Sequence, residues 1–357
     1  MKLDINNGEK HMDLGLLHKQ INIELSHLDF EKIWPGFKPL KFALFNQDKC
    51  YFDGKYIKKT AAFCANTSIL YEGEYIATWM VAEDLPIEVL TSKLVHEMFH
   101  GFQNKQGWNC WPDEIEALFR YEYNAENLSI KLRENKLLLS LLDHFDNNML
   151  EELLSLRKKR SIDFPYQFMY EIKTEEIEGT ANYVEWQVLK QLDTKKANDL
   201  LKNMHLEMTE INHMFPIRIS CYYSGALMIN ALVNKGIYNF NSNTRPTLIP
   251  ILNNIESFKD DLLESKEDFN DAKEAVNKYY METEEIIKNV IAKNEIALKG
   301  PLELGYVNIY NGRCHNNYIT TTYFLMYKEN EENKMLPGNY VVKMIDEKNI
   351  DLVYKWE

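Results

Sequence analysis

One octapeptide decides how the rest of this sequence is interpreted: Leu94-Val95-His96-Glu97-Met98-Phe99-His100-Gly101. It lies inside a longer apolar repeat at helical spacing, formed by Leu90, Leu94, Val95, Met98, Phe99 and Phe102. This spacing predicts a helix over about 85–105, which Asp84 can cap and whose first turn tolerates Pro86. Two histidines four residues apart on a helix share one face, so both can direct a ring nitrogen at one ion about 2 Å away. The octapeptide therefore predicts a metal-binding helix.

The residue between the two histidines adds chemistry to this helix. In the order H-E-x-x-H, Glu97 lies beside the first ligand and can take a proton from a metal-bound water and later pass it to a leaving amine. The flanking apolar residues indicate that the polar trio is buried, where an unpaired carboxylate and two unpaired imidazoles would each be costly. A bound metal removes this cost. We therefore predict one Zn²⁺ on His96 and His100, rather than two surface histidines on an amphipathic helix.

A mononuclear catalytic zinc needs a third protein ligand and one open position. The helical run predicted over 165–192 offers a stripe of polar residues on one face: Glu171, Glu175, Glu178, Asn182 and Glu185. We select Glu178, because the small residues Gly179 and Ala181 beside it would let another helix approach closely. Asn182, one turn further on, could accept the N–H of a ligating imidazole. The alternative interpretation of the stripe is an exposed acidic face on a long helix.

The motifs His96-Glu97-x-x-His100 and Glu178-Gly179-x-Ala181-x-Tyr183 together resemble those of the gluzincin branch of the zincin superfamily of zinc metallopeptidases. The segment starting Tyr222-Tyr223-Ser224-Gly225 is similar to a Y-x-x-G segment of one-zinc aminopeptidases in that superfamily. The resemblance implies that Tyr222 stabilises an oxyanion and that an edge strand, here Tyr75–Val81, pairs with extended substrate. The sequence departs from the family in a helical insertion over 112–166 and in lacking the G-x-M-x-N segment of aminopeptidases.

The Tyr222 hydroxyl also has a chemical argument of its own. A neutral phenol is a strong hydrogen-bond donor that can meet a developing oxyanion without neutralising Glu97. The neighbouring Tyr223 could take this role instead, and either tyrosine could simply belong to the core. Arg218, one helical turn earlier, could pair with a substrate carboxylate or form a surface salt bridge. The remaining histidines of the helical and C-terminal parts fit no ligand spacing and are interpreted as structural: His144, His205, His213 and His315.

The rest of the chain predicts an α+β protein. Apolar runs separated by turn residues predict a small mixed sheet over about 41–82, with Asp53-Gly54 as a hairpin turn. Residues 112–299 are predicted to be largely helical, in segments 126–143, 165–192, 219–234 and 258–299. After Gly300-Pro301, strands are predicted at Tyr306–Tyr310, Tyr318–Tyr327 and Tyr340–Met344. We place a domain boundary here, between a zincin-like metallopeptidase domain (1–299) and a β-rich segment of unknown role (300–357).

Composition limits the partners and the location. The 41 Lys and Arg residues against 54 Asp and Glu residues give a net charge of −13, which disfavours binding to nucleic acid or to anionic lipid. No run approaches the roughly 18 apolar residues that cross a bilayer, and the N-terminus has no secretory signal. The five cysteines show no C-x-x-C pair, as expected of reduced thiols. A cytoplasmic protein is predicted, with a peptide or protein substrate and an undetermined oligomeric state.

The predicted function is zinc-dependent peptide hydrolysis by Glu97-assisted attack of a zinc-bound water. A di-iron carboxylate protein is the main alternative, because the pattern E-x-x-H occurs both at Glu24–His27 and at Glu97–His100. A zincin-fold binding or regulatory protein without turnover is another. The sequence does not distinguish cleavage inside a chain from cleavage at its ends.

Overall fold

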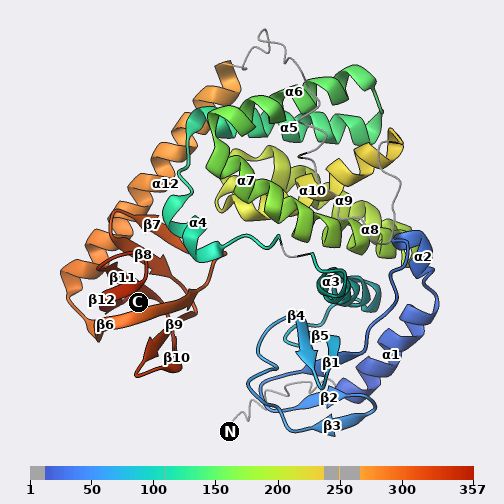
Figure 1. Cartoon of the computed structure of the whole chain (residues 1–357), viewed down its shortest axis with the longest axis horizontal. Coiled ribbons are helices and arrows are strands. Elements are labelled where there is room, and N and C mark those ends of the chain that lie inside the picture. The colour runs from blue at the N-terminus through green and yellow to red at the C-terminus, as the bar shows by residue number, and fades with distance from the viewer. Residues whose placement is uncertain (1–12, 109, 237–248, 250–265) are drawn as a thin grey trace, which may run out of the picture. The chain divides into compact units, whose positions relative to one another are not determined.

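The computed structural model describes residues 13–108, 110–236, 249 and 266–357 (Figure 1). Helices and two separate sheets make up these residues, so the predicted α+β class is confirmed. The chain divides into two compact units, each assembled from segments that are distant in sequence. Of the described residues, the first comprises 13–108 and 180–202, and the second comprises 110–179, 203–236, 249 and 266–357.

The first unit contains a five-stranded mixed sheet with the order β3-β2-β1-β5-β4. Its strands are β1 (Phe42–Phe45), β2 (Cys50–Phe52), β3 (Lys55–Ile57), β4 (Thr67–Tyr71) and β5 (Glu74–Met80). β1 and β5 run parallel, and the other neighbouring pairs are antiparallel. The turn between β2 and β3 has positive φ angles at Asp53 (49°) and Gly54 (80°), as the predicted hairpin requires. The small mixed sheet predicted over 41–82 is thus confirmed.

The predicted edge strand is wrong. β5, which corresponds to Tyr75–Val81, lies between β1 and β4, and the edge of the sheet is β4. Ile76, Ala77 and Thr78 at the centre of β5 are fully buried, whereas Leu70 on β4 is 64% exposed. Both faces and both edges of β5 are covered, which favours apolar side chains on this strand. An extended ligand that pairs with this end of the sheet would therefore meet β4.

Five helices accompany this sheet along the chain: α1 (Leu14–Ser26), α2 (Phe30–Ile33), α3 (Ile87–Lys105), α8 (Thr180–Leu192) and α9 (Thr194–Thr209). α3 packs on β5 and β4, and α8 packs on α3 (Figure 1). All six residues of the apolar repeat on α3 are buried, which confirms the predicted helix. Its N-cap is Pro86 and not Asp84, because Pro86 itself is still extended at ψ 139°.

The second unit begins with a layer of packed helices. They are α4 (Glu114–Arg120), α5 (Ala125–Asp143), α6 (Asn147–Asp163), α7 (Pro165–Thr174), the π-turn η1 (Glu175–Gly179), the 3₁₀ turn η2 (Ile211–Met214), α10 (Ile217–Asn234) and α12 (Lys266–Lys293). The helical character predicted over 112–299 is confirmed for most of the described residues. The predicted helix over 258–299 lies partly outside them and ends at Lys293, and residues 296–299 are already a strand.

The C-terminal part forms a seven-stranded antiparallel sheet with the order β10-β9-β6-β12-β11-β8-β7. Its strands are β6 (Ile296–Val307), β7 (Arg313–His315), β8 (Tyr318–Thr321), β9 (Phe324–Glu329), β10 (Glu332–Pro337), β11 (Tyr340–Met344) and β12 (Asn349–Lys355). α12 packs against this sheet through Ile287 and Val290. Side chains of α4 cover another part of its core.

Two strand predictions in this sheet need correction. The segment predicted as one strand over Tyr318–Tyr327 is two strands, because it is interrupted at Tyr323, whose φ is 68°, and β8 pairs with β11 whereas β9 pairs with β6. The strand predicted over Tyr306–Tyr310 ends at Val307, and residues 308–312 form a loop. β6 also runs through Gly300 and Pro301, opposite an irregularity in β12 between Ile350 and Leu352. A bulge of this kind accommodates glycine and proline within a strand, and the domain boundary at 299/300 remains a prediction.

Candidate metal centre

The two imidazoles of α3 converge in a buried site. His96 and His100 are 8% and 6% exposed, and their Nε2 atoms lie 3.1 Å apart. Two nitrogen ligands of a tetrahedral zinc ion, each at about 2.05 Å, are separated by about 3.3 Å. The predicted pair of ligands therefore has the spacing that such an ion requires.

The opposite edge of each ring meets an acceptor. Nδ1 of His100 lies 2.8 Å from Oε1 of Gln103, whose Nε2 donates to Thr180 Oγ1 at 2.9 Å. Nδ1 of His96 lies 3.4 Å from Oε2 of Glu185. Burial opposes ionisation of Glu185, but Lys93 and His96 outweigh it and lower the pKa of that carboxyl to about 2. Glu185 is thus an ionised acceptor.

Both contacts suit a ring that carries its proton on Nδ1. In that tautomer each neutral imidazole presents the lone pair of Nε2. Two lone pairs that face each other across 3.1 Å in a buried site would repel. A bound cation turns this repulsion into coordination. In each ring, the acceptor beside Nδ1 and the position of Nε2 therefore both suit a bound metal ion.

Glu178 joins the two histidines. One ligand atom from each of His96, His100 and Glu178 lies within 4.8 Å of the other two, and all three residues are buried. This group could hold a metal ion, and a His₂Glu set is one of the arrangements that bind catalytic zinc. The three residues that the sequence singled out as ligands are thus brought together.

The π-turn η1 determines where Glu178 points. α7, η1 and α8 form one continuous helical run in place of the regular helix predicted over 165–192. A π-turn inserts one extra residue and rotates everything that follows it. A Cβ atom on Gly179 would lie 2.5 Å from Gly225 Cα on α10, so only two glycines permit this close crossing. The predicted close approach of another helix beside Glu178 is confirmed.

The predicted single stripe along this run is wrong, and so is its alternative of an exposed acidic face. All five stripe residues are buried, with exposed fractions of 1% to 6%. Glu171, which precedes the π-turn, and Glu175, its first residue, face a group of buried cations: Lys131, Arg157 and Arg160. After the π-turn, Glu185 faces His96. One inserted residue therefore separates carboxylates that serve the helical core from those beside the imidazoles.

Glu175 anchors the turn itself. Its carboxylate accepts from Lys131 Nζ at 2.8 Å and from both Nη atoms of Arg157 at 2.6 and 2.9 Å. Burial raises the pKa of Glu175, but Arg157 and Lys131 outweigh this and hold the pKa well below its usual range. A carboxylate held by two buried cations fixes the backbone three residues before Glu178.

Arg218 links Glu178 to Tyr222. Its Nη2 donates to Oε1 of Glu178 at 2.6 Å, its Nε donates to the Tyr222 hydroxyl at 3.0 Å, and its Nη1 contacts Glu114. Arg218 is only 7% exposed, so the surface salt bridge considered for it is wrong. Its hydrogen-bond donors serve two carboxylates of this chain. Because a carboxylate has two oxygens, Glu178 can accept from Arg218 and still offer an oxygen to a metal.

Tyr222 and Tyr223 have different surroundings. Burial, and next the charge of Glu178, raise the pKa of Tyr222 well above its ordinary value, so this phenol is a neutral donor. The Tyr223 hydroxyl instead accepts from Asn203 at 3.3 Å. Tyr222 is therefore the tyrosine that shares Arg218 with Glu178. Glu97, the remaining predicted residue, lies half-buried on α3 between the two histidines.

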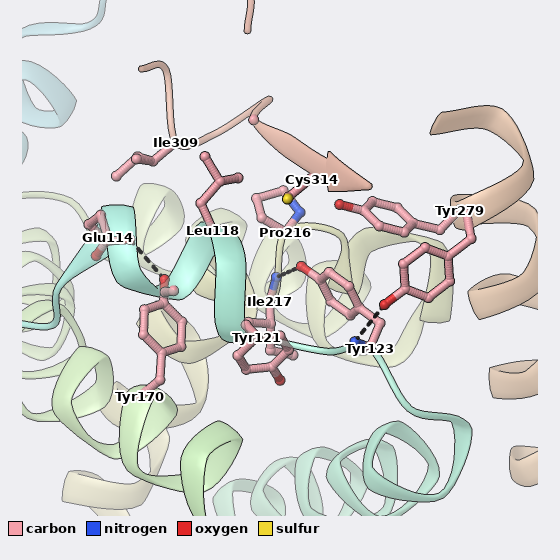
Figure 2. Close-up of a pocket in the computed structure, with 13 residues that line it drawn as sticks. Glu114, Leu118, Tyr121, Tyr123, Tyr170, Pro216, Ile217, Tyr279, Ile309 and Cys314 are labelled. Carbon is pink, nitrogen blue, oxygen red and sulfur yellow. Dashed lines mark hydrogen bonds between the residues drawn. The ribbon is translucent and has the colours of Figure 1, made fainter. Parts of the chain in front are cut away.

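A small pocket lies on the far side of Glu114 (Figure 2). Its volume is about 60 Å³, and Tyr170 points across it to donate to Glu114 at 2.9 Å. The other phenols on its wall are also engaged, such as Tyr123, which accepts from the backbone of Ile217 at 3.1 Å. This volume holds a few water molecules, well below the several hundred Å³ of a ligand pocket. The pocket wall supports Glu114 through Tyr170.

The second E-x-x-H motif does not join this group. Glu24 and His27 lie at the end of α1, where the two side chains contact each other at 3.8 Å and His27 is 62% exposed. Within the part of the chain that the structure describes, the metal-binding group contains neither of them. The di-iron interpretation therefore lacks its second motif.

Comparison with protein-family models, curated proteins and solved structures finds no match to this chain. Among the described residues, no helix is both long enough and apolar enough to span a bilayer.

Sequence reasoning missed Gln103 and Glu185 as partners of the imidazoles. Gln103 follows His100 by one helical turn, a spacing that could have identified it. Replacing Glu185 with glutamine is expected to weaken metal binding about 10- to 100-fold, because an amide is a poorer acceptor for the His96 N–H. Competition with a chelator measures this affinity. The control is Glu88→Gln, which removes a carboxylate that pairs with Lys196 on the same unit, and equal affinities in both variants would contradict the role of Glu185.

Proposed function

We propose that this chain is a zinc-dependent peptidase in which His96, His100 and Glu178 hold the metal. The observation that carries the proposal is the convergence of ligand atoms from three buried residues within 4.8 Å, two of them imidazole nitrogens 3.1 Å apart. A carboxylate on the same helix and a half-buried neutral phenol near the third ligand complete the set that peptide hydrolysis requires. The resemblance of these motifs to gluzincins supports the same function.

Each residue has a distinct role in this proposal. When bound, zinc lowers the pKa of a coordinated water and polarises the scissile carbonyl. Glu97 takes a proton from the attacking water while the water oxygen bonds to the carbonyl carbon. It then returns a proton to the amine as the C–N bond breaks. The Tyr222 hydroxyl donates to the oxygen of the carbonyl as negative charge develops there. Gln103 and Glu185 hold the two rings in the orientation that binding demands.

The substrate class follows from the chemistry and from the charge of the chain. We propose a peptide or protein substrate and no nucleic acid or membrane partner, because a chain of net charge −13 repels polyanions. A cytoplasmic location agrees with this proposal. Zinc at about one ion per chain is the expected content, since three ligands with an open position suit an ion without geometric demands of its own.

Two measurements test the proposal together. Metal analysis after zinc reconstitution gives the stoichiometry, and a mixed peptide library read by mass spectrometry gives cleavage without assuming a specificity. We expect about one zinc per chain and cleavage that a chelator abolishes. Zinc below a tenth of an ion per chain would contradict the metal centre. Full zinc without any cleavage would contradict the peptidase and favour a binding protein.

Replacing Tyr222 with phenylalanine removes one hydroxyl and is expected to lower kcat roughly 10²–10³-fold, the usual loss for one oxyanion donor. Zinc content and thermal unfolding should not change. Tyr223→Phe is the matched control, because its hydroxyl contacts Asn203 and not Arg218. If Tyr223→Phe causes the large loss and Tyr222→Phe does not, the role belongs to the neighbouring residue.

A further inference from the structure

A loop of the C-terminal sheet reaches the Tyr222 hydroxyl. Tyr310 lies in the loop 308–312 between β6 and β7, and its hydroxyl is 3.1 Å from that of Tyr222. The two residues are 88 positions apart in sequence. Tyr310 is 47% exposed, whereas Tyr222 is half-buried. The Tyr222 hydroxyl therefore contacts a more exposed side chain, which belongs to the C-terminal part of the chain.

The loop that carries Tyr310 is held by the sheet. The side chain of Asn308 accepts from the Tyr310 backbone at 3.2 Å and donates to Thr322 at 3.2 Å. The backbone of Asn308 donates to Thr321 at 3.2 Å. These bonds form a turn of the Asx type that is tied to the ends of β8 and β9. The position of Tyr310 is thus determined by the fold of the C-terminal sheet.

The hydrogen bonds of Tyr222 indicate what this contact does. Arg218 donates to the Tyr222 oxygen at 3.0 Å, so that one of its lone pairs is occupied. Donation from a guanidinium polarises the phenol and strengthens its own O–H as a donor. The Tyr310 hydroxyl is the other hydrogen-bond partner of Tyr222, and either oxygen of this pair can be the donor. When Tyr310 donates, the Tyr222 oxygen accepts from Arg218 and from Tyr310 together, and its own proton is left for a polarised substrate oxygen.

We propose that Tyr310 is a positioning residue for Tyr222, so that the strand-rich C-terminal segment completes the substrate site. This inference rests on the proposed function, in which Tyr222 is the oxyanion donor. Arg218 and Tyr310 hold the phenol from two sides, the first from the helical layer and the second from the sheet. Without Tyr310 the Tyr222 hydroxyl can rotate, and a donor that must first be oriented contributes less to the transition state.

A double-mutant cycle between Tyr222→Phe and Tyr310→Phe tests the inference. We expect Tyr310→Phe alone to lower kcat about three- to tenfold, the effect of one neutral hydrogen bond, with little change in KM or in zinc content. In the Tyr222→Phe background the second substitution should have no further effect. Tyr323→Phe is the control, because Tyr323 lies in the same sheet and is 72% exposed. Thermal unfolding verifies that all variants fold.

A binding measurement separates this inference from the proposed function. A peptide hydroxamate binds a zinc ion and presents an oxygen to Tyr222 without turnover, so calorimetry on the zinc-loaded variants yields a second cycle. Coupling in this cycle without any peptide cleavage would support the role of Tyr310 and overturn the peptidase alone. Equal losses for Tyr310→Phe in both backgrounds, or no loss in either, would overturn the positioning role. Failure of the zinc-loaded wild type to bind the hydroxamate would also overturn it.

Discussion

Replacing Glu97 with glutamine is expected to lower kcat roughly 10²–10⁴-fold, the contribution of a positioned general base. Glutamine keeps the size of the side chain and its place on α3, but it cannot take a proton from the attacking water. His96 and His100 keep their ring partners, so zinc content should remain at the level of the wild type. Rates on a peptide identified from the library, together with metal analysis, measure both effects.

The Glu97→Gln result distinguishes an enzyme from a protein that only holds a metal. Thermal unfolding is the control, since Glu97 is half-buried and its amide variant should fold normally. Cleavage that persists at a similar rate in the variant would identify a contaminating protease or another catalytic group. A variant that loses its zinc would instead place Glu97 among the residues that hold the metal.

The fold could be predicted where the pattern of apolar residues is local. The repeat on α3 and the Asp53-Gly54 turn each specify their element from within a few residues, and both elements form as predicted. The order of the strands could not be obtained in this way. β5 is interior because β1, some thirty residues earlier, pairs with it in parallel, a contact that no neighbouring residues encode.

The site residues could likewise be predicted only where the sequence pattern is local. His96 and His100 follow from their spacing on one helix, whereas Glu178 was selected from a stripe of similar residues by the small side chains next to it. The π-turn that directs it is invisible in the periodicity, because it depends on Gly225 from α10 and on the cations that hold Glu175. Such a turn costs local hydrogen-bond geometry, and π-turns occur frequently at functional sites.

The contribution of the C-terminal sheet was not predictable for a related reason. The sequence predicts Tyr310 at the end of a strand, where successive side chains point to alternate faces of the sheet. The strand ends at Val307, and the turn built by Asn308 directs Tyr310 toward α10 instead. A side-chain hydrogen bond that competes with the strand ladder is what changes the outcome.

Loss of a ligand should have the second large effect. We expect His96→Ala, His100→Ala and Glu178→Gln each to weaken zinc binding roughly 10²–10³-fold, since apparent zinc binding energies near 10–16 kcal/mol are shared among about four ligands. Glutamine is chosen for Glu178 because its amide oxygen can still accept from Arg218, so the variant does not leave that buried cation without a partner. Competition with a chelator gives the affinities.

The controls for this series follow from the two sides of the π-turn. Glu185→Gln removes an acceptor for a ligand and should fall between the wild type and the ligand variants. Glu175→Ala is unsuitable as a control, because it would leave Lys131 and Arg157 buried without their carboxylate, a change that costs about 3–5 kcal/mol and would unfold part of the helical layer.

If Glu178→Gln binds zinc as tightly as the wild type while Glu185→Gln loses it, Glu185 is the third ligand and Glu178 belongs to the Arg218 network alone. If both variants bind like the wild type, the metal is held by the two histidines without a carboxylate, and a catalytic centre of the His₂Glu type is excluded.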